Sequence, residues 1–138
     1  MIDCIDDKND LWLVFELCGK PLSKVLFPTK GQFFKGERIY EVQQDMQICE
    51  ILEQDHCREF KKIIKRVLEG LQLFQDAGLV HCDLKTENIL VSFDLQKKIV
   101  SSVKLIDFGT SFSFEKINKS IEVTTPEYLP PEILEYVD

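Results

Sequence analysis

The stretch "LVHCDLKTENILV", residues 79–91, places four polar side chains between two aliphatic runs. His81, Asp83, Lys85 and Asn88 fall in this short segment, and burying such groups is costly unless they are paired or take part in chemistry. Asp83 and Lys85 are two positions apart in an expected extended loop, so both can point toward one substrate. A carboxylate there can accept a hydroxyl proton while an ammonium neutralises phosphate charge. The stretch therefore predicts a loop that carries out phosphoryl transfer.

The segments on either side of this loop predict a helix and a hairpin. Residues 58–77 carry apolar side chains at helical spacing on one stripe, from Phe60 to Phe74, and Gly78 follows as a C-cap. We interpret the stripe as core packing. After the loop, "NILVSF" (88–93) and "VKLIDF" (103–108) are typical of strands, and "DLQKKIVSS" between them can form a hairpin turn.

The predicted hairpin brings together two residues that are distant in sequence. Asn88 stands at its start and Asp107 at its end, and both offer the oxygen ligands that Mg²⁺ prefers. Magnesium is held by one or two protein side chains together with phosphate oxygens. The pair therefore predicts a magnesium site beside the loop.

The remaining segments are less regular. Residues 11–18, "LWLVFELC", predict a short buried strand that ends at "GKP". Residues 22–40 predict a loop with one short helix, and residues 40–54 predict a further helix with Val42, Met46, Cys49 and Leu52 on one face. Residues 109–131 predict a loop that leads into a short helix at "PPEIL".

Composition and charge limit the kinds of partner. The 138 residues are 44% hydrophobic and 30% charged, as in a soluble globular domain or part of one. The net charge of −7 argues against nucleic-acid and anionic-membrane partners, and we interpret "KKIIKR" (61–66) as a solvated helix face. No apolar run approaches the ~20 residues of a membrane helix. Five cysteines without CxxC spacing favour an intracellular setting, cytoplasmic or nuclear.

Three motifs in order carry a family resemblance. "HCDLKTEN" resembles the protein-kinase catalytic loop H-R-D-L-x-x-x-N, "DFG" the magnesium motif, and "TPEYLPPE" the segment that closes with A-P-E. "LWLVFELCGKPL" resembles the last small-lobe strand running into the hinge. The chain is thus identified as a member of the eukaryotic-type protein kinases. Lys85 is the form typical of serine/threonine kinases.

The resemblance implies an α+β, protein-kinase-like fold of which residues 1–138 form a part. This part would hold the last N-lobe strand, the hinge (15–20) and the first half of the mainly helical C-lobe. The catalytic loop would span residues 81–90, and the DFG to PPE segment residues 107–132. The implied activity is ATP-dependent phosphoryl transfer to Ser or Thr hydroxyls of a protein substrate, with ATP and Mg²⁺ as cofactors.

The resemblance also implies a role for individual residues. Asp83 would accept the hydroxyl proton, Lys85 would steady the γ-phosphate, and Asn88 and Asp107 would hold magnesium. Thr125 would hydrogen-bond toward the catalytic loop at the substrate side. The nucleotide would meet four residues: Phe15 at the gatekeeper position, the Glu16 carbonyl and Cys18 amide at the adenine edge, and Leu90. His81 is expected to be a structural hydrogen-bonding residue rather than an acid or base.

The sequence departs from the family pattern at several points. Cys82 replaces the Arg that pairs with an activation-loop phosphate, so we expect little control through that contact, although Ser120 and Thr124 remain candidate phosphorylation sites. The segment between the hinge and the long helix, residues 28–56, is longer than usual. Its "GERIY" region is interpreted as either a docking insert or a longer helix pair.

Two hypotheses therefore stay open. The chain lacks a glycine-rich loop and a lysine strand before the hinge, and Glu132 lacks its usual Arg partner. The first hypothesis is a serine/threonine kinase of which these residues are a fragment. The second is an inactive half-kinase that acts as a binding or regulatory module, with a protein partner covering the apolar face of helix 58–77. We expect the chain on its own to be inactive, because phosphoryl transfer needs positioning from both lobes.

Overall fold

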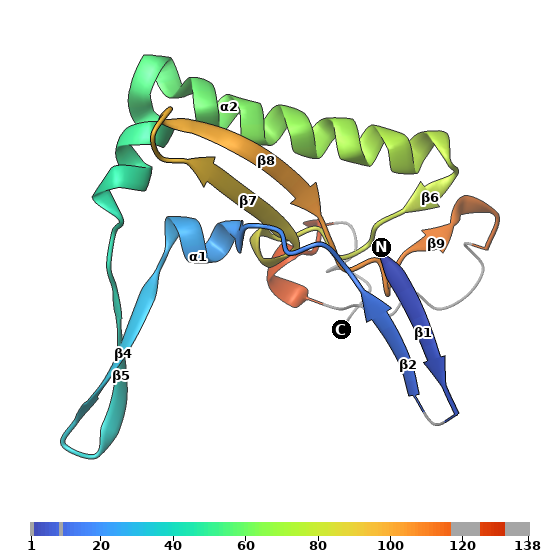
Figure 1. Ribbon diagram of the computed structural model, residues 1–138, viewed down its shortest axis with the longest axis horizontal. Coiled ribbons are helices and arrows are strands. Elements are labelled where there is room, and N and C mark those ends of the chain that lie inside the picture. Colours follow the sequence, from blue (N-terminus) through green and yellow to red (C-terminus); the bar gives the residue numbers. More distant parts are fainter. Residues whose placement is uncertain (1, 9, 117–124, 132–138) are drawn as a thin grey trace.

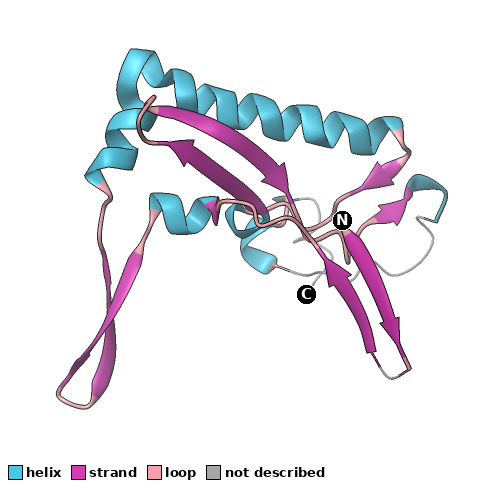
Figure 2. Ribbon diagram, viewed as in Figure 1, coloured by secondary structure: helices cyan, strands magenta, loops and turns pink. Residues whose placement is uncertain are grey.

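The computed structural model describes residues 2–8, 10–116 and 125–131 and shows an α+β arrangement of antiparallel strands and helices (Figures 1 and 2). The strands are β1 (Asp3–Asp7), β2 (Asp10–Val14), β3 (Lys20–Pro21), β4 (Thr29–Phe34), β5 (Glu37–Val42), β6 (Leu79–Val80), β7 (Ile89–Asp94), β8 (Ile99–Leu105) and β9 (Phe112–Ser113). The helices are α1 (Leu22–Leu26) and α2 (Met46–Asp76), with 3₁₀ turns at Thr86–Asn88, Phe114–Lys116 and Pro126–Tyr128. The presence of both helices and antiparallel strands agrees with the predicted α+β class, while the division into kinase lobes stays a prediction.

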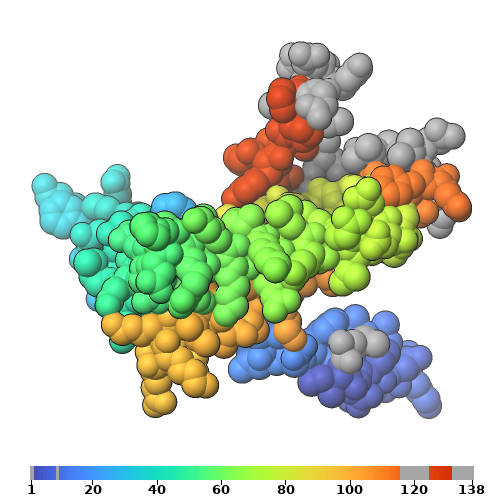
Figure 3. Space-filling view, turned by 90° about the horizontal axis from the view of Figure 1, so that it is seen from above, coloured from blue at the N-terminus to red at the C-terminus, as the bar shows by residue number. Residues whose placement is uncertain are grey.

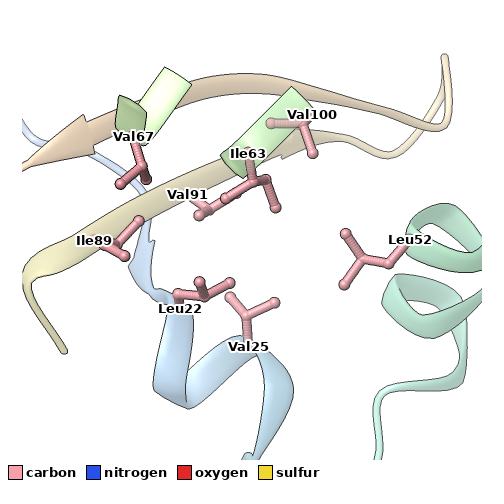
Figure 4. Close-up of a cluster of buried hydrophobic side chains, with 8 residues drawn as sticks. All are labelled: Leu22, Val25, Leu52, Ile63, Val67, Ile89, Val91 and Val100. Atoms are coloured by element: carbon pink, nitrogen blue, oxygen red, sulfur yellow. The ribbon is translucent and has the colours of Figure 1, made fainter. Parts of the chain in front are cut away.

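The core forms where α2 packs along the β7–β8 hairpin (Figure 1). The β7–β8 hairpin joins β3 in a three-stranded antiparallel sheet of order β3-β7-β8. Branched side chains from the helices and strands meet between α2, the sheet and α1 (Figure 4); they are Leu22, Val25, Leu52, Ile63, Val67, Ile89, Val91 and Val100. The predicted helix 58–77 is confirmed, and so is the pairing of two strands after the loop. The second strand is Ile99–Leu105 and not 103–108, so residues 99–102, expected in the turn, belong to the strand.

The apolar stripe of the long helix divides between core and solvent. Ile63 and Val67 are buried, with Ile63 fully inaccessible, whereas Ile64 and Leu68 are 44% and 60% exposed. The interpretation of the whole stripe as core packing is therefore wrong for its second row. Gly78 takes a φ of +68°, one residue beyond the C-cap Ala77, and so ends the helix as predicted.

A kink divides α2 into two helical parts. Residues Asp55, His56 and Cys57 have positive φ angles within the element, and Gln54 has an extended ψ of 155°. The kink is tied to the turn of the hairpin, because the Gln54 side chain donates a hydrogen bond to the Lys98 carbonyl at 2.7 Å. The first of the two parts begins at Met46, after the N-cap Asp45. The prediction of a helix from residue 40 is therefore wrong for residues 40–45.

Just after the kink, the buried carboxylate of Glu59 joins α2 to the edge of β8. It accepts a hydrogen bond from the Val100 N–H at 2.7 Å and lies 3.4 Å from the Lys62 ammonium. Burial by itself would raise the pKa of Glu59. The hydrogen bond from Val100 and the charge of Lys62 outweigh burial and hold the pKa below its usual value.

Two hairpins project from the body at different ends of the molecule (Figures 1 and 3). The first, β1–β2, contains only residues 11–14 of the predicted strand 11–18, and both of its strands are exposed. The prediction of a buried strand is therefore wrong, because this two-stranded sheet has no covering layer in the described part of the chain. The second, β4–β5, replaces most of the loop expected at 22–40, whereas the short helix expected there is α1.

The β4–β5 hairpin depends on a two-residue turn at Lys35 and Gly36. Their φ angles are +50° and +86°, the combination that a tight hairpin with right-handed strand twist requires. All twelve strand residues are exposed, including Phe33 and Phe34.

The helix predicted at "PPEIL" lies outside the described residues from residue 132 onward. Within the described ranges, α1 and α2 are each too short or too polar to cross a bilayer.

Truncating Ile63 should test the packing of α2 against the hairpin. We expect Ile63→Ala to lower the free energy of unfolding by about 2–5 kcal/mol, because it leaves a cavity at a fully buried position. Ile64→Ala on the same helix is the control and should change it by less than about 1 kcal/mol. Urea unfolding followed by circular dichroism measures both. Equal losses in the two variants would contradict the described orientation of the helix.

Stability should also depend on pH through Glu59. A carboxyl whose pKa is lowered on folding stabilises the fold above its ordinary pKa, and that contribution is lost as pH falls through the lowered value. We expect Glu59→Gln to remove this part of the acid sensitivity, while the exposed Glu53→Gln retains it. Unfolding midpoints measured from neutral pH down to pH ~3 compare the two variants. A Glu59→Gln profile that parallels wild type would show that Glu59 is not the group responsible.

Candidate active site

The ends of α2 and of the hairpin position the loop of residues 81–85. After the left-handed turn at Gly78 the chain enters β6, which pairs with β9 through Leu79↔Ser113 and Val80↔Phe112. The loop then leads through the 3₁₀ turn Thr86–Asn88 into β7. The end of β8 lies beside this turn, because the Ile106 N–H donates to the Asn88 carbonyl at 3.0 Å.

Asp83 lies at the centre of the loop and is 7% exposed. Its Oδ1 accepts a hydrogen bond from the Thr125 hydroxyl at 2.8 Å. Its Oδ2 accepts one from the Asn88 amide at 3.0 Å and lies 2.7 Å from the Lys85 ammonium. The same Asn88 amide group also donates to the Asp83 backbone carbonyl at 2.8 Å. Lys85, Asn88 and Thr125 thus fix one buried carboxylate.

Lys85 connects the carboxylate with the segment at Thr125. Its ammonium donates to the Thr125 hydroxyl at 2.9 Å as well as contacting Asp83. The hydrogen bond to Asp83 raises the pKa of Lys85, and the negative charges of Asp83, Asp107 and Glu87 add to this. Lys85 is therefore a permanent cation at physiological pH.

His81 links the loop to the end of the hairpin through hydrogen bonds. It is 3% exposed, its Nε2 donates to the Ile106 carbonyl at 3.2 Å, and its Nδ1 accepts from the Asp83 N–H at 3.3 Å. These bonds assign the neutral tautomer with the proton on Nε2. The ring packs between Phe74 and Phe108, with centroids 5.6 and 5.5 Å away. The contacts agree with the structural role expected for His81.

Asn88 and Asp107 flank the same end of the β7–β8 hairpin, where Ile89 pairs with Leu105. Asp107 is exposed, has a φ of +64° and directly follows Ile106, which is hydrogen-bonded to Asn88. Because the Asn88 amide nitrogen is used by Asp83, the amide oxygen is the atom that suits a cation. Asparagine and aspartate oxygens fit Mg²⁺ with phosphate ligands. The described residues contain no cluster of three or more His, Cys, Asp or Glu that could hold a metal alone.

Cys82 occupies the position where the family pattern has Arg. Its φ is +66°, which is strained for a residue with a side chain, and burial raises the pKa of its thiol. The thiol therefore stays neutral and offers no charge to a phosphate. The candidate phosphorylation sites Ser120 and Thr124 and the acidic Glu132 lie outside the described residues.

The predicted nucleotide-binding residues lie around the segment that joins β2 to β3. Strand pairing sets Leu90 opposite both Pro21 and Lys104, and the Glu16 carboxylate forms an ion pair with Lys104. Cys18 is half-buried beside them, and its thiol donates to the Glu16 carbonyl at 3.5 Å. Phe15 is 60% exposed.

Sequence reasoning missed the residues that dock this segment on the sheet. The Gly19 N–H donates to the Ser92 hydroxyl at 3.1 Å, and a Cβ at Gly19 would lie 2.0 Å from the Val91 carbonyl oxygen. Lys104, the partner of Glu16, was missed as well. Ser92 and Lys104 carry no local signal, because strand pairing alone brings them to this segment, and the sequence indicated Gly19 only as part of the "GKP" that ends a strand.

Comparison with known proteins shows the family of the chain. The protein kinase domain family matches residues 1–138, and the chain therefore belongs to the protein kinase family. Smooth-muscle myosin light chain kinase of Gallus gallus is 31% identical over 98% of the chain and 6% of its own length. A dual specificity protein kinase YAK1 homolog of Arabidopsis thaliana is 35% identical over 65% of the chain and 10% of its own length. Serine/threonine-protein kinase 17A of Oryctolagus cuniculus is 32% identical over 57% of the chain and 19% of its own length.

Removing the Thr125 hydroxyl should expose the dependence of Asp83 on its partners. We expect Thr125→Val, which keeps the shape of the side chain, to lower the free energy of unfolding by about 1–3 kcal/mol by leaving a buried carboxylate with one donor fewer. Thr125→Ser keeps the hydroxyl and should cost clearly less. Denaturant unfolding compares the two variants. Equal destabilisation would mean that the methyl group, not the hydrogen bond, holds this contact.

Proposed function

We propose that this chain carries the catalytic loop of a protein serine/threonine kinase, which transfers phosphate from ATP to Ser or Thr hydroxyls of a protein substrate. The observation that supports this most strongly is the buried carboxylate of Asp83, held by Lys85, Asn88 and Thr125. Such a fixed carboxylate next to a fixed ammonium suits a reaction that moves a proton and an anionic group at one point.

Asp83 would orient the substrate hydroxyl and accept its proton at a carboxylate oxygen. The Thr125 hydroxyl supports this role, because it donates to Asp83 Oδ1 at 2.8 Å and accepts from Lys85 at 2.9 Å. A serine or threonine hydroxyl of a substrate offers the same donor and acceptor. Lys85 would steady negative charge as the proton leaves, since its raised pKa keeps it protonated.

Magnesium–ATP supplies the phosphoryl group and neutralises part of its charge when it is bound. Asn88 and Asp107 would hold the metal through their side-chain oxygens. Glu16 and Cys18 would bind the adenine edge through backbone atoms, with Phe15 and Leu90 against the ring. The ion pair of Glu16 with Lys104 and the bond from Gly19 to Ser92 would keep that segment against the sheet.

Specificity for Ser and Thr rests on two supports. A lysine at position 85 is typical of serine/threonine kinases, and one relative is named a serine/threonine-protein kinase while another is named dual specificity.

We propose that further protein elements complete the nucleotide site, because the exposed β1–β2 hairpin offers a sheet face that no other described residues cover. The 138 residues alone would then be inactive.

A second candidate function is a non-catalytic binding module. The second row of α2 favours it, because Phe60, Ile64 and Leu68 are exposed and lie four residues apart along one side of the helix. A protein partner would cover such a face. The retained set of Asp83, Lys85, Asn88 and Asp107 is the reason we place catalysis first.

Asp83→Asn in the full-length native protein separates the two functions. We expect it to lower phosphate transfer from radiolabelled ATP to a Ser/Thr peptide library by about 10²- to 10⁴-fold, because an amide cannot accept the proton. Asp76→Asn at an exposed position of α2 is the control and should leave the rate unchanged. A wild-type protein that binds ATP without transferring phosphate, or an Asp83→Asn variant as active as wild type, would support the binding module instead.

A further inference from the structure

A cavity of about 380 Å³ lies away from the catalytic loop, at the base of the β4–β5 hairpin. Its walls come from α1, the outer half of β7 and the start of α2. Val25, Ile48, Phe93 and Leu95 give it an apolar interior, and Pro28 and Asp45 mark where the chain leaves for the hairpin and returns from it. Figure 4 shows Val25 and Val91, two of its lining residues, pointing into the core from α1 and β7.

Two lysines give the cavity positive charge. Lys20 and Lys24 both line it and are exposed, and the ion pairs found among the described residues include neither of them. The acidic lining residue, Asp45, is already used, because its carboxylate caps α2 by accepting from the N–H groups of Gln47 and Ile48. The cavity therefore combines an apolar interior with two lysines that have no ion-pair partner in the described part of the chain, although the whole chain carries a net charge of −7.

The adjoining hairpin extends this surface. The Gln43 N–H donates to the Pro28 carbonyl at 2.7 Å and closes the hairpin at its base. Beyond that point β4 and β5 form a sheet of only two strands, and Phe33 and Phe34 are 77% and 59% exposed. A chain that leaves the cavity in an extended conformation would meet a strand edge and these aromatic side chains.

We propose that this cavity is a docking site for an acidic peptide segment of a partner protein, anchored by one aliphatic side chain. The volume suits a side chain of leucine size with part of its backbone, and the unpaired lysines suit flanking carboxylates. The site contains none of Asp83, Lys85, Asn88, Asp107 or Thr125, so the inference goes beyond phosphoryl transfer. It assigns the 28–56 segment to docking.

Fluorescence anisotropy on the full-length native protein tests the proposal. The probe is a labelled pentapeptide with a central leucine between two pairs of glutamates, and the matched peptides replace either the glutamates by glutamine or the leucine by alanine. We expect the acidic leucine peptide to bind and the Lys20→Gln/Lys24→Gln protein to bind it about three- to tenfold more weakly. Leu95→Ala should weaken binding too, because Leu95 lines the cavity. Lys97→Gln and Leu73→Ala, which change residues outside the cavity, are the controls and should bind as wild type does.

Each other outcome overturns the proposal. Equal binding of the glutamine peptide would show that the lysines do not recognise acidic partners, and equal binding of the alanine peptide would show that the cavity takes no anchor. Absence of binding at millimolar peptide would remove the docking site altogether. Concentration-dependent self-association, lost in Lys20→Gln/Lys24→Gln and accompanied by no peptide binding, would assign the cavity to a second copy of the chain.

Discussion

Burial of the Asp83 carboxylate is the constraint on which the rest of the candidate active site depends. A carboxylate that is 7% exposed must be paired or become neutral, and here Lys85, Asn88 and Thr125 supply the compensating contacts. The three partners come from the loop, the 3₁₀ turn before β7 and a segment about forty residues further on. The same carboxylate therefore connects three segments of the chain, and we expect any change at Asp83 to affect both chemistry and local order.

The helix and hairpin hold this carboxylate in place. Ile63 and Val67 fix α2 on the sheet, Glu59 joins the helix to the β8 backbone at Val100, and Gly78 turns the chain back toward β6. His81 then spans the gap to Ile106 with a neutral ring, which places Asp107 at the end of β8 beside the loop. Packing of α2 on the sheet thus determines where the polar groups of the loop lie. Two residues of the site, Cys82 and Asp107, have the positive φ angles that are strained for residues with a side chain, as do Asp55, His56 and Cys57 at the kink of α2.

The sequence was sufficient to predict the loop, the helix before it and the hairpin after it. These features are local: the polar spacing from His81 to Asn88, the 3.6-residue period of the helix and the alternation of β7 and β8 each lie within one window. The β4–β5 hairpin was missed because the dipeptide at its turn, Lys35-Gly36, is a weaker hairpin signal than Asn-Gly or Asp-Gly, although Gly36 has the expected positive φ. The exposure of strand 10–14 and the docking of Gly19 on Ser92 depend on which elements meet, which no single window contains.

The claim that Asp83 organises the site is tested most directly by nitrogen-15 NMR of the lysine ammonium groups. The hydrogen bond to Asp83 predicts that Lys85 stays protonated to a higher pH than an ordinary lysine, with the surrounding carboxylates adding to the effect. The account predicts a raised Lys85 pKa in wild type and its return toward the ordinary value in Asp83→Asn. A Lys85 ammonium that titrates at the ordinary value in wild type, or one whose titration is unchanged by Asp83→Asn, would contradict it.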